Sequence, residues 1–80
     1  NYEKVNYNLG IIYFKIGDYK NPLTYFGRAI KNIPSDPDYY VNRALTKLSM
    51  NDTIGLCIDL NKARSLGDST LSDLLNQYCQ

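Results

Sequence analysis

Apolar side chains recur every three or four residues along this 80-residue chain, and glycine, proline and aspartate interrupt the pattern. This recurrence is the period of an α-helix that buries one face. The pattern predicts five helices, over residues 3–15, 19–32, 37–50, 53–66 and 70–79. The expected fold class is therefore all-α, with neighbouring helices joined into antiparallel hairpins by short connections.

Residues typical of helix ends lie between the predicted helices. Gly17 suits the end of the first helix, and Asp18 suits the start of the second, because its side chain can accept a bond from a free backbone N–H. Asp36 followed by Pro37 is a helix start, since proline at the first helical position removes no helical hydrogen bond. The triplet at 51–53 is a formal N-glycosylation acceptor, but we interpret it as a turn.

The chain repeats itself with an offset of 34 residues. The shift aligns six pairs that are identical or similar in size or charge: Asn8 with Asn42, Gly10 with Ala44, Asp18 with Asp52, Phe26 with Leu60, Arg28 with Lys62, and Ala29 with Ala63. One offset without gaps indicates an internal repeat. The small residues in these pairs allow helices to approach to about 8 Å. The repeat predicts an α-solenoid of two stacked helix hairpins and a closing helix.

Six residues of the first hairpin have the spacing of a known repeat signature: Leu9, Gly10, Tyr13, Phe26, Ala29 and Pro34. On these residues the chain resembles the tetratricopeptide repeat family. The resemblance implies one domain over residues 1–80, with repeats at about 3–36 and 37–68 and a capping helix at about 69–79. The second repeat departs from the signature at several positions: Arg43, Lys47, Leu56 and Asp68.

The resemblance also implies a concave groove lined by the first helix of each hairpin. The residues that it places there are Tyr7, Ile11, Phe14, Val41, Asn42, Leu45 and Leu48. Such a mostly apolar groove would suit an amphipathic helix or an extended apolar peptide of another protein. The alternative is that some of these residues are ordinary core, covered by a neighbouring repeat or by dimerisation.

Some members of the family clamp a C-terminal carboxylate with lysine, asparagine and arginine on the groove side. Tyr7 and Ile11 occupy the matching positions of the first repeat and cannot provide such groups, and only Asn42 matches in the second repeat. We therefore expect no carboxylate clamp. The predicted function is a scaffold that binds another protein or a peptide. The alternative is a structural or self-associating end fragment of a longer array, forming a homodimer and having no ligand of its own.

Composition argues against several other functions. The chain has no histidine, the commonest general base and metal ligand, and no glycine-rich phosphate loop. We expect no enzyme, cofactor or metal site. Nine basic and eight acidic residues are interspersed and leave a net charge of +1, so we expect no nucleic-acid partner. The longest apolar stretch is residues 9–14, whereas a membrane span needs roughly 20 residues. The sequence favours a soluble protein, slightly favours the cytoplasm, and identifies no partner.

Two cysteines, Cys57 and Cys79, are too few for a disulfide scaffold or a four-ligand zinc site. They project from neighbouring predicted helices, so a disulfide between them is open. We expect two buried free thiols, because free cysteine behaves as a small hydrophobic residue.

Arg43 and Lys47 lie one turn apart on the third predicted helix, where the family has apolar residues. They can contact an acidic partner, or pair with a carboxylate of the chain such as Asp38 or Asp59. We expect a salt-bridged surface, because exposed ion pairs usually contribute little to recognition or stability.

Overall fold

The computed structural model describes residues 2–80, and the side chains of residues 4–80. Over these residues the chain forms five helices and no strand: α1 (Tyr2–Lys15), α2 (Lys20–Asn32), α3 (Pro37–Ser49), α4 (Thr53–Ser65) and α5 (Ser72–Tyr78). The predicted all-α fold class is confirmed, and no helix end differs from its expected position by more than two residues. The first residue of the expected domain lies outside the described residues.

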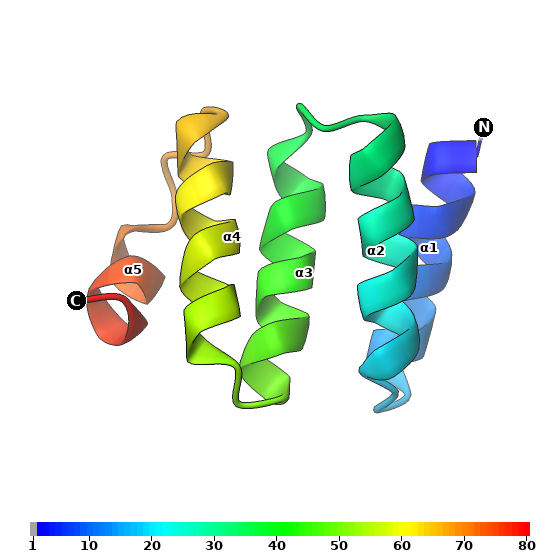
Figure 1. Ribbon diagram of the computed structural model, residues 1–80, viewed down its shortest axis with the longest axis horizontal. Helices are drawn as coiled ribbons and strands as arrows, with labels where there is room; N and C mark the ends of the chain where they lie inside the picture. Colours follow the sequence, from blue (N-terminus) through cyan, green and yellow to red (C-terminus); the bar gives the residue numbers. More distant parts are fainter. Residues whose placement is uncertain (1) are drawn as a thin grey trace.

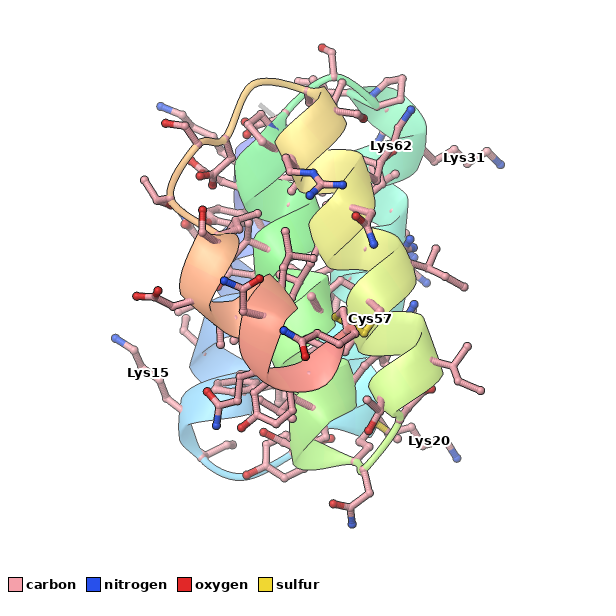
Figure 2. The ribbon with its side chains drawn as sticks, turned by 90° about the vertical axis from the view of Figure 1, so that its left-hand side faces the viewer. Lys15, Lys20, Lys31, Cys57 and Lys62 are labelled. Atoms are coloured by element: carbon pink, nitrogen blue, oxygen red, sulfur yellow. A yellow bond between two sulfur atoms is a disulfide. The ribbon has the colours of Figure 1, made fainter. Side chains whose placement is uncertain are left out.

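The helices form a repeat-like stack of antiparallel hairpins. α1 packs against α2 and α3 against α4, and the chain passes in order from α1 to α5 across the molecule (Figure 1). The view turned by 90° shows two layers, with α1, α3 and α5 on one side and α2 and α4 on the other (Figure 2). Lys20, Lys31 and Lys62 extend outward on the side of α2 and α4. Lys15 extends outward on the side of α1.

Two connections share the same glycine–aspartate chemistry. Gly17 (φ 86°) and Gly67 (φ 111°) follow α1 and α4 in the left-handed backbone region that favours glycine. The next residue in each case is an aspartate with a lowered pKa. Hydrogen bonds from Asn21 lower the pKa of Asp18, and hydrogen bonds from Thr70 lower that of Asp68. These turns end one helix and direct the chain into the next.

The other two helix starts use aspartate caps. Asp36 accepts a bond from the backbone N–H of Asp38 at 2.9 Å, at the start of α3. Asp52 accepts a bond from the backbone N–H of Gly55 at 2.8 Å, at the start of α4. Asn51, before the second cap, has a positive φ of 62°, which asparagine tolerates better than most residues. The chain turns at Asn51, as the sequence predicts, and α4 begins at Thr53.

Four small residues lie where helices cross. Gly10, Ala29, Ala44 and Ala63 are all buried, as the repeat requires. The main apolar cluster lies in the second half of the chain and is made of Tyr40, Ala44, Leu56, Leu60, Ala63, Leu71 and Leu75. This cluster joins α3, α4 and the segment that ends in α5.

The expectation of two free thiols is wrong, because Cys57 and Cys79 form a disulfide. The chain turns back after α4, buries Leu71 and Leu75, and brings the two cysteine Cα atoms to 5.6 Å. This separation is ordinary for a disulfide. The bond fastens the end of α5 to α4, so α5 caps the second hairpin. Among the described residues, no helix has the length and apolar character that a bilayer span requires.

Candidate functional site

The residues predicted to line a groove lie on α1 and α3, in the same layer of the molecule. Six of them form three repeat-equivalent pairs separated by 34 residues: Tyr7 with Val41, Ile11 with Leu45, and Phe14 with Leu48. All six are half-buried, as is Asn42. α1 and α3 contact each other directly. The two helices therefore bring the predicted residues to one side of the molecule, although their environments differ.

Tyr7 and Asn42 join α1 to α3. The Tyr7 ring lies 5.0 Å from the ring of Tyr39 and 5.9 Å from that of Phe26, between centroids. Its hydroxyl accepts a hydrogen bond from Asn42 Nδ2 at 2.8 Å, and the same amide donates to the carbonyl of Asp38 at 3.0 Å. Burial, followed by the nearby Asp38 carboxylate, raises the pKa of the Tyr7 phenol above 10.0. These polar groups bond to each other rather than pointing freely at a ligand.

Three further predicted residues also have packing partners inside the chain. The Phe14 ring meets Tyr19 edge-on at 5.4 Å. Val41 and Leu48 pack against the main apolar cluster, which α5 closes. That cluster includes Leu71 and Leu75 from the end of the chain. These residues contribute to the stacking of the helices.

Ile11 and Leu45 form the remaining pair and turn toward the open side of the layer. Each follows a buried small residue, Gly10 or Ala44, which faces the second helix of its own hairpin. One residue along an α-helix is a rotation of about 100°. The side chains of Ile11 and Leu45 therefore point away from α2 and α4, and both remain partly exposed. Two aliphatic side chains at one repeat position make the apolar centre of the candidate site.

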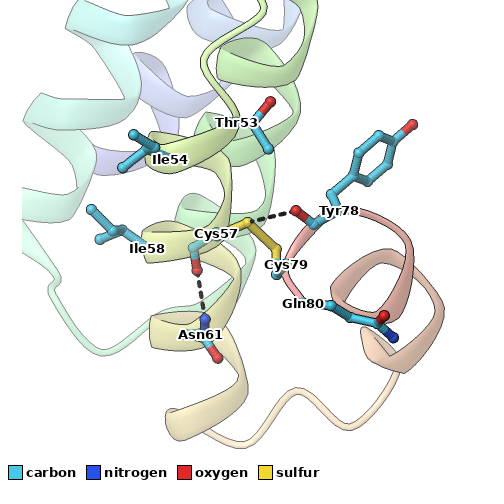
Figure 3. Close-up of a pocket in the computed structure, with 8 residues that line it drawn as sticks. All are labelled: Thr53, Ile54, Cys57, Ile58, Asn61, Tyr78, Cys79 and Gln80. Carbon is cyan, nitrogen blue, oxygen red and sulfur yellow. Dashed lines mark hydrogen bonds between the residues drawn. A yellow bond between two sulfur atoms is a disulfide. The ribbon is translucent and has the colours of Figure 1, made fainter.

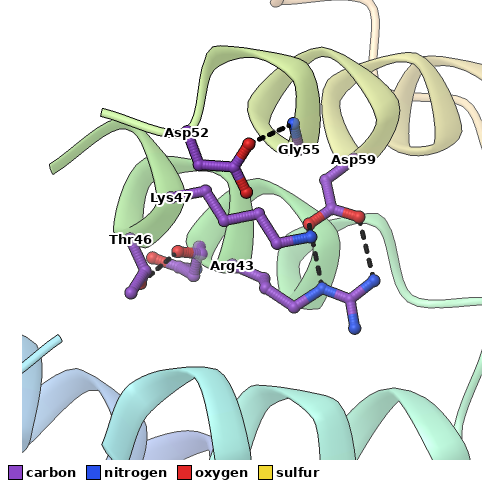
Figure 4. Close-up of polar contacts among 7 residues, drawn as sticks. Arg43, Thr46, Lys47, Asp52, Gly55 and Asp59 are labelled. Carbon is purple, nitrogen blue, oxygen red and sulfur yellow. Dashed lines mark hydrogen bonds and ion pairs between the residues drawn. The ribbon is translucent and has the colours of Figure 1, made fainter. Parts of the chain in front are cut away.

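Arg43 and Lys47 both bind Asp59 of α4 (Figure 4). The guanidinium of Arg43 donates to both carboxylate oxygens at 2.9 Å, and Lys47 Nζ lies 3.0 Å from Asp59 Oδ2. The hydrogen bond to Asp59 raises the pKa of Arg43 above its ordinary value, although burial opposes the shift. The expected pairing with Asp59 is confirmed. The carboxylate, however, is buried, with 1% of its side chain exposed, so the pair is not a surface salt bridge.

This ion cluster ties α3 to α4. Both carboxylate oxygens of Asp59 are occupied by cations of the same chain, and the two-pronged contact with Arg43 is the strong form of such a pair. The sequence contains a signal for it, because Asp59 lies directly before Leu60 on the buried side of α4. A charge on a buried helix face requires a partner, and Arg43 and Lys47 were the available cations.

A pocket of about 590 Å³ lies where α5 meets α4, and the sequence did not reveal it (Figure 3). It is lined by Thr53, Ile54, Cys57, Ile58, Asn61, Tyr78, Cys79 and Gln80. The Asn61 amide donates to the carbonyl of Cys57 at 2.9 Å. The pocket is wide open to solvent, and the disulfide forms part of its lining. The pairing of the cysteines is the signal that would have located it.

Comparisons of the chain with protein-family models, with curated proteins and with solved structures found no match. Within residues 2–80, no group of three or more histidine, cysteine, aspartate or glutamate side chains is placed to hold a metal ion.

Proposed function

We propose that this chain is a protein-interaction module of the tetratricopeptide type, which binds an apolar peptide or helix of another protein along α1 and α3. The observation that supports the proposal is the repeated, partly exposed aliphatic pair Ile11 and Leu45 on adjacent helices of one layer. The layer of α2 and α4 presents Lys20, Lys31 and Lys62 to solvent, and it also exposes Ile54 and Ile58 of α4. Unlike those two isoleucines, Ile11 and Leu45 lie at one repeat position on two neighbouring helices.

The spacing of the two helices suggests the kind of ligand. Packed helices have axes about 8–10 Å apart, so Ile11 and Leu45 offer two apolar contacts separated by roughly that distance. A bound α-helix advances about 10 Å in seven residues, and an extended polyproline-II segment advances about 9 Å in its three-residue turn. Both return a side chain to the same face, so the ligand should carry two large apolar side chains at positions i and i+7 of a helix, or at i and i+3 of a polyproline-II segment.

The test uses a double variant of the two central residues, Ile11→Asp with Leu45→Asp. Peptides of about 15 residues are selected from a random display library on the wild-type protein, and their affinities are measured for each variant by fluorescence anisotropy. We expect the double variant to weaken binding by at least tenfold, because fully burying one large aliphatic side chain is worth about 1.5–3 kcal/mol. Tyr7 is left unchanged, because its contacts with Asn42 and Tyr39 stabilise the stack.

The matched control is Ile58→Asp, which replaces an exposed isoleucine on α4. Selected peptides should bind this variant as they bind the wild type. Equal binding to the double variant and to the wild type would contradict the proposal. So would amide chemical-shift changes that follow the α4–α5 pocket rather than α1 and α3 when a peptide is added.

A further inference from the structure

The outer edge of α1 carries an apolar stripe that nothing in the chain covers fully. The stripe consists of Val5, Leu9, Ile12 and Ile16, and we call it the α1 edge stripe. Val5 is 54% exposed, Ile12 56% and Ile16 72%, and Leu9 is half-buried. Spacings of four and three residues place Val5, Leu9 and Ile12 on one side of α1, as in the seam of a helix pair. Ile16 follows the last residue of the helix and continues the stripe at a spacing of four.

The repeat shows what such a face does elsewhere in this molecule. The positions 34 residues later on α3 are Tyr39, Arg43, Thr46 and Met50. Tyr39 is 6% exposed and Thr46 is fully buried, and the Tyr39 ring contacts Tyr7 of α1. α2 also packs on α3. On α3, therefore, Tyr39 and Thr46 are covered, whereas Arg43 reaches Asp59 of α4 and Met50 is 45% exposed. On α1 the equivalent positions are more exposed and more apolar.

The other end of the stack is closed. Leu71 and Leu75 are buried against α3 and α4, and the disulfide from Cys57 to Cys79 holds α5 in place. A second copy of the chain therefore finds no matching open face there for head-to-tail stacking of hairpins. A symmetric contact, in which each copy uses the same surface, does not need that end.

The stripe is complementary to itself. Its spacing reads the same in both directions, so two antiparallel α1 helices place Leu9 opposite Ile12 of the second copy, and Val5 opposite its Ile16. The stripe contains no charged residue, and the net charge of +1 produces little repulsion between copies. An antiparallel helix pair is also the arrangement that α2 and α3 already adopt (Figure 1).

We propose that a second copy of this chain covers the α1 edge stripe, with the two α1 helices antiparallel about a two-fold axis. The contact lies on a different face of α1 from Ile11, so it is independent of the proposed peptide site. One helix pair buries less surface than a standard protein interface. The dimer should therefore be weak, with a dissociation constant of about 10–1,000 µM.

Sedimentation equilibrium tests the proposal, with protein concentrations from about 10 µM to about 2 mM. The wild type should show an average mass that rises toward that of a dimer. Ile12→Lys should raise the dissociation constant at least tenfold, because it places a charge at the centre of the apolar contact. The matched control Ile58→Lys changes an isoleucine of α4 that is 63% exposed, and it should leave the constant unchanged within about twofold. Circular dichroism melting confirms that both variants are folded.

A dilution series of ¹⁵N–¹H spectra locates the contact. Amide signals of α1 around Leu9 and Ile12 should move with concentration, and those of α4 around Ile58 should not. A wild type that is monomeric at about 2 mM would overturn the proposal and leave the stripe to a helix of a different protein. A dimer that Ile58→Lys weakens as much as Ile12→Lys would also overturn it. The Ile11→Asp, Leu45→Asp variant should still dimerise, so failure of the peptide site is distinguishable from failure of the dimer.

Discussion

The two hairpins have the same repeat length, but different interactions hold them together. In the first hairpin, aromatic rings do most of the packing, with Phe26 buried against Gly10 and Tyr13 stacked on Tyr25 at 5.7 Å. The second hairpin is built on aliphatic side chains and on the buried carboxylate of Asp59. A common helix arrangement is therefore compatible with two kinds of interior, provided that each interior satisfies its own polar and steric requirements.

The ends of the two hairpins differ as well. The second hairpin is capped by α5 and its disulfide, whereas the first ends at the α1 edge stripe. Local opening is easiest where few apolar groups are buried and no covalent link exists. We infer that α1 is the first part of the stack to open, and that α3 and α4 form its most stable part.

The largest effects, of similar size, are expected from Asp59→Ala and from removal of the disulfide. The substitution leaves Arg43 and Lys47 half-buried without their carboxylate and removes three charge-assisted contacts between α3 and α4. Removing one member of a buried ion cluster costs about 3–5 kcal/mol, and we expect about 3 kcal/mol here because both cations can still reach water. Urea unfolding followed by circular dichroism measures the change. The control Asp73→Ala, at an exposed position of α5, should change stability by no more than about 0.5 kcal/mol. Equal losses in the two variants would show that the buried cluster does not stabilise the second hairpin.

The second of these effects concerns the cap. The double variant Cys57→Ala, Cys79→Ala removes a disulfide between residues 22 positions apart, which should cost about 3 kcal/mol. Amide hydrogen exchange resolves where the loss occurs. Protection should fall most in α5, around Leu75, because only the residual packing of that helix then holds it against α4. A loss of protection confined to α1 and α2 would contradict the assignment of α5 as a covalently fastened cap.

The helices could be predicted from sequence because their signals are local. Asp36, Pro37 and Asp52 mark helix starts through side-chain and backbone chemistry that depends on neighbouring residues only. The 34-residue offset supplied the pairing of helices into hairpins. Cys57 and Cys79 could not be paired from sequence, because their distance depends on how the chain turns after α4.

The candidate site was predicted less completely than the fold. The offset groups Ile11 and Leu45 as equivalent positions, and both side chains are partly exposed. It could not show that Tyr7 bonds to Asn42, because that contact depends on side chains that meet only after the hairpins stack. The same limit applies to Val41, which packs against the apolar cluster that α5 closes. Periodicity places a residue on a face, whereas packing decides whether the face is open.

The smallest expected effect tests how each hairpin fills its helix crossing. Gly10 and Phe26 of the first hairpin correspond to Ala44 and Leu60 of the second. The first hairpin therefore combines a smaller small residue, glycine, with a larger apolar side chain, phenylalanine. A Cβ added at Gly10 would lie 2.5 Å from Phe26 Cε1, and the ring is too deeply buried to move aside. Gly10→Ala should therefore destabilise the protein by about 1 kcal/mol, because overpacking by about 1–3 kcal/mol exceeds the gain of about 1 kcal/mol in helix propensity.

The sign of this effect should reverse when Phe26 is replaced by leucine, the residue of the second hairpin. In the Phe26→Leu background the added methyl group has room, so Gly10→Ala should stabilise the protein by up to about 1 kcal/mol. Gly27→Ala is the matched control within the same hairpin, because a Cβ there meets no atom within 4 Å, and it should be stabilising in both backgrounds. A double-mutant cycle measured by urea unfolding gives the coupling directly. If Gly10→Ala has the same effect with Phe26 and with leucine, the two positions are independent, and the difference between the hairpins does not arise from paired volumes at the crossing.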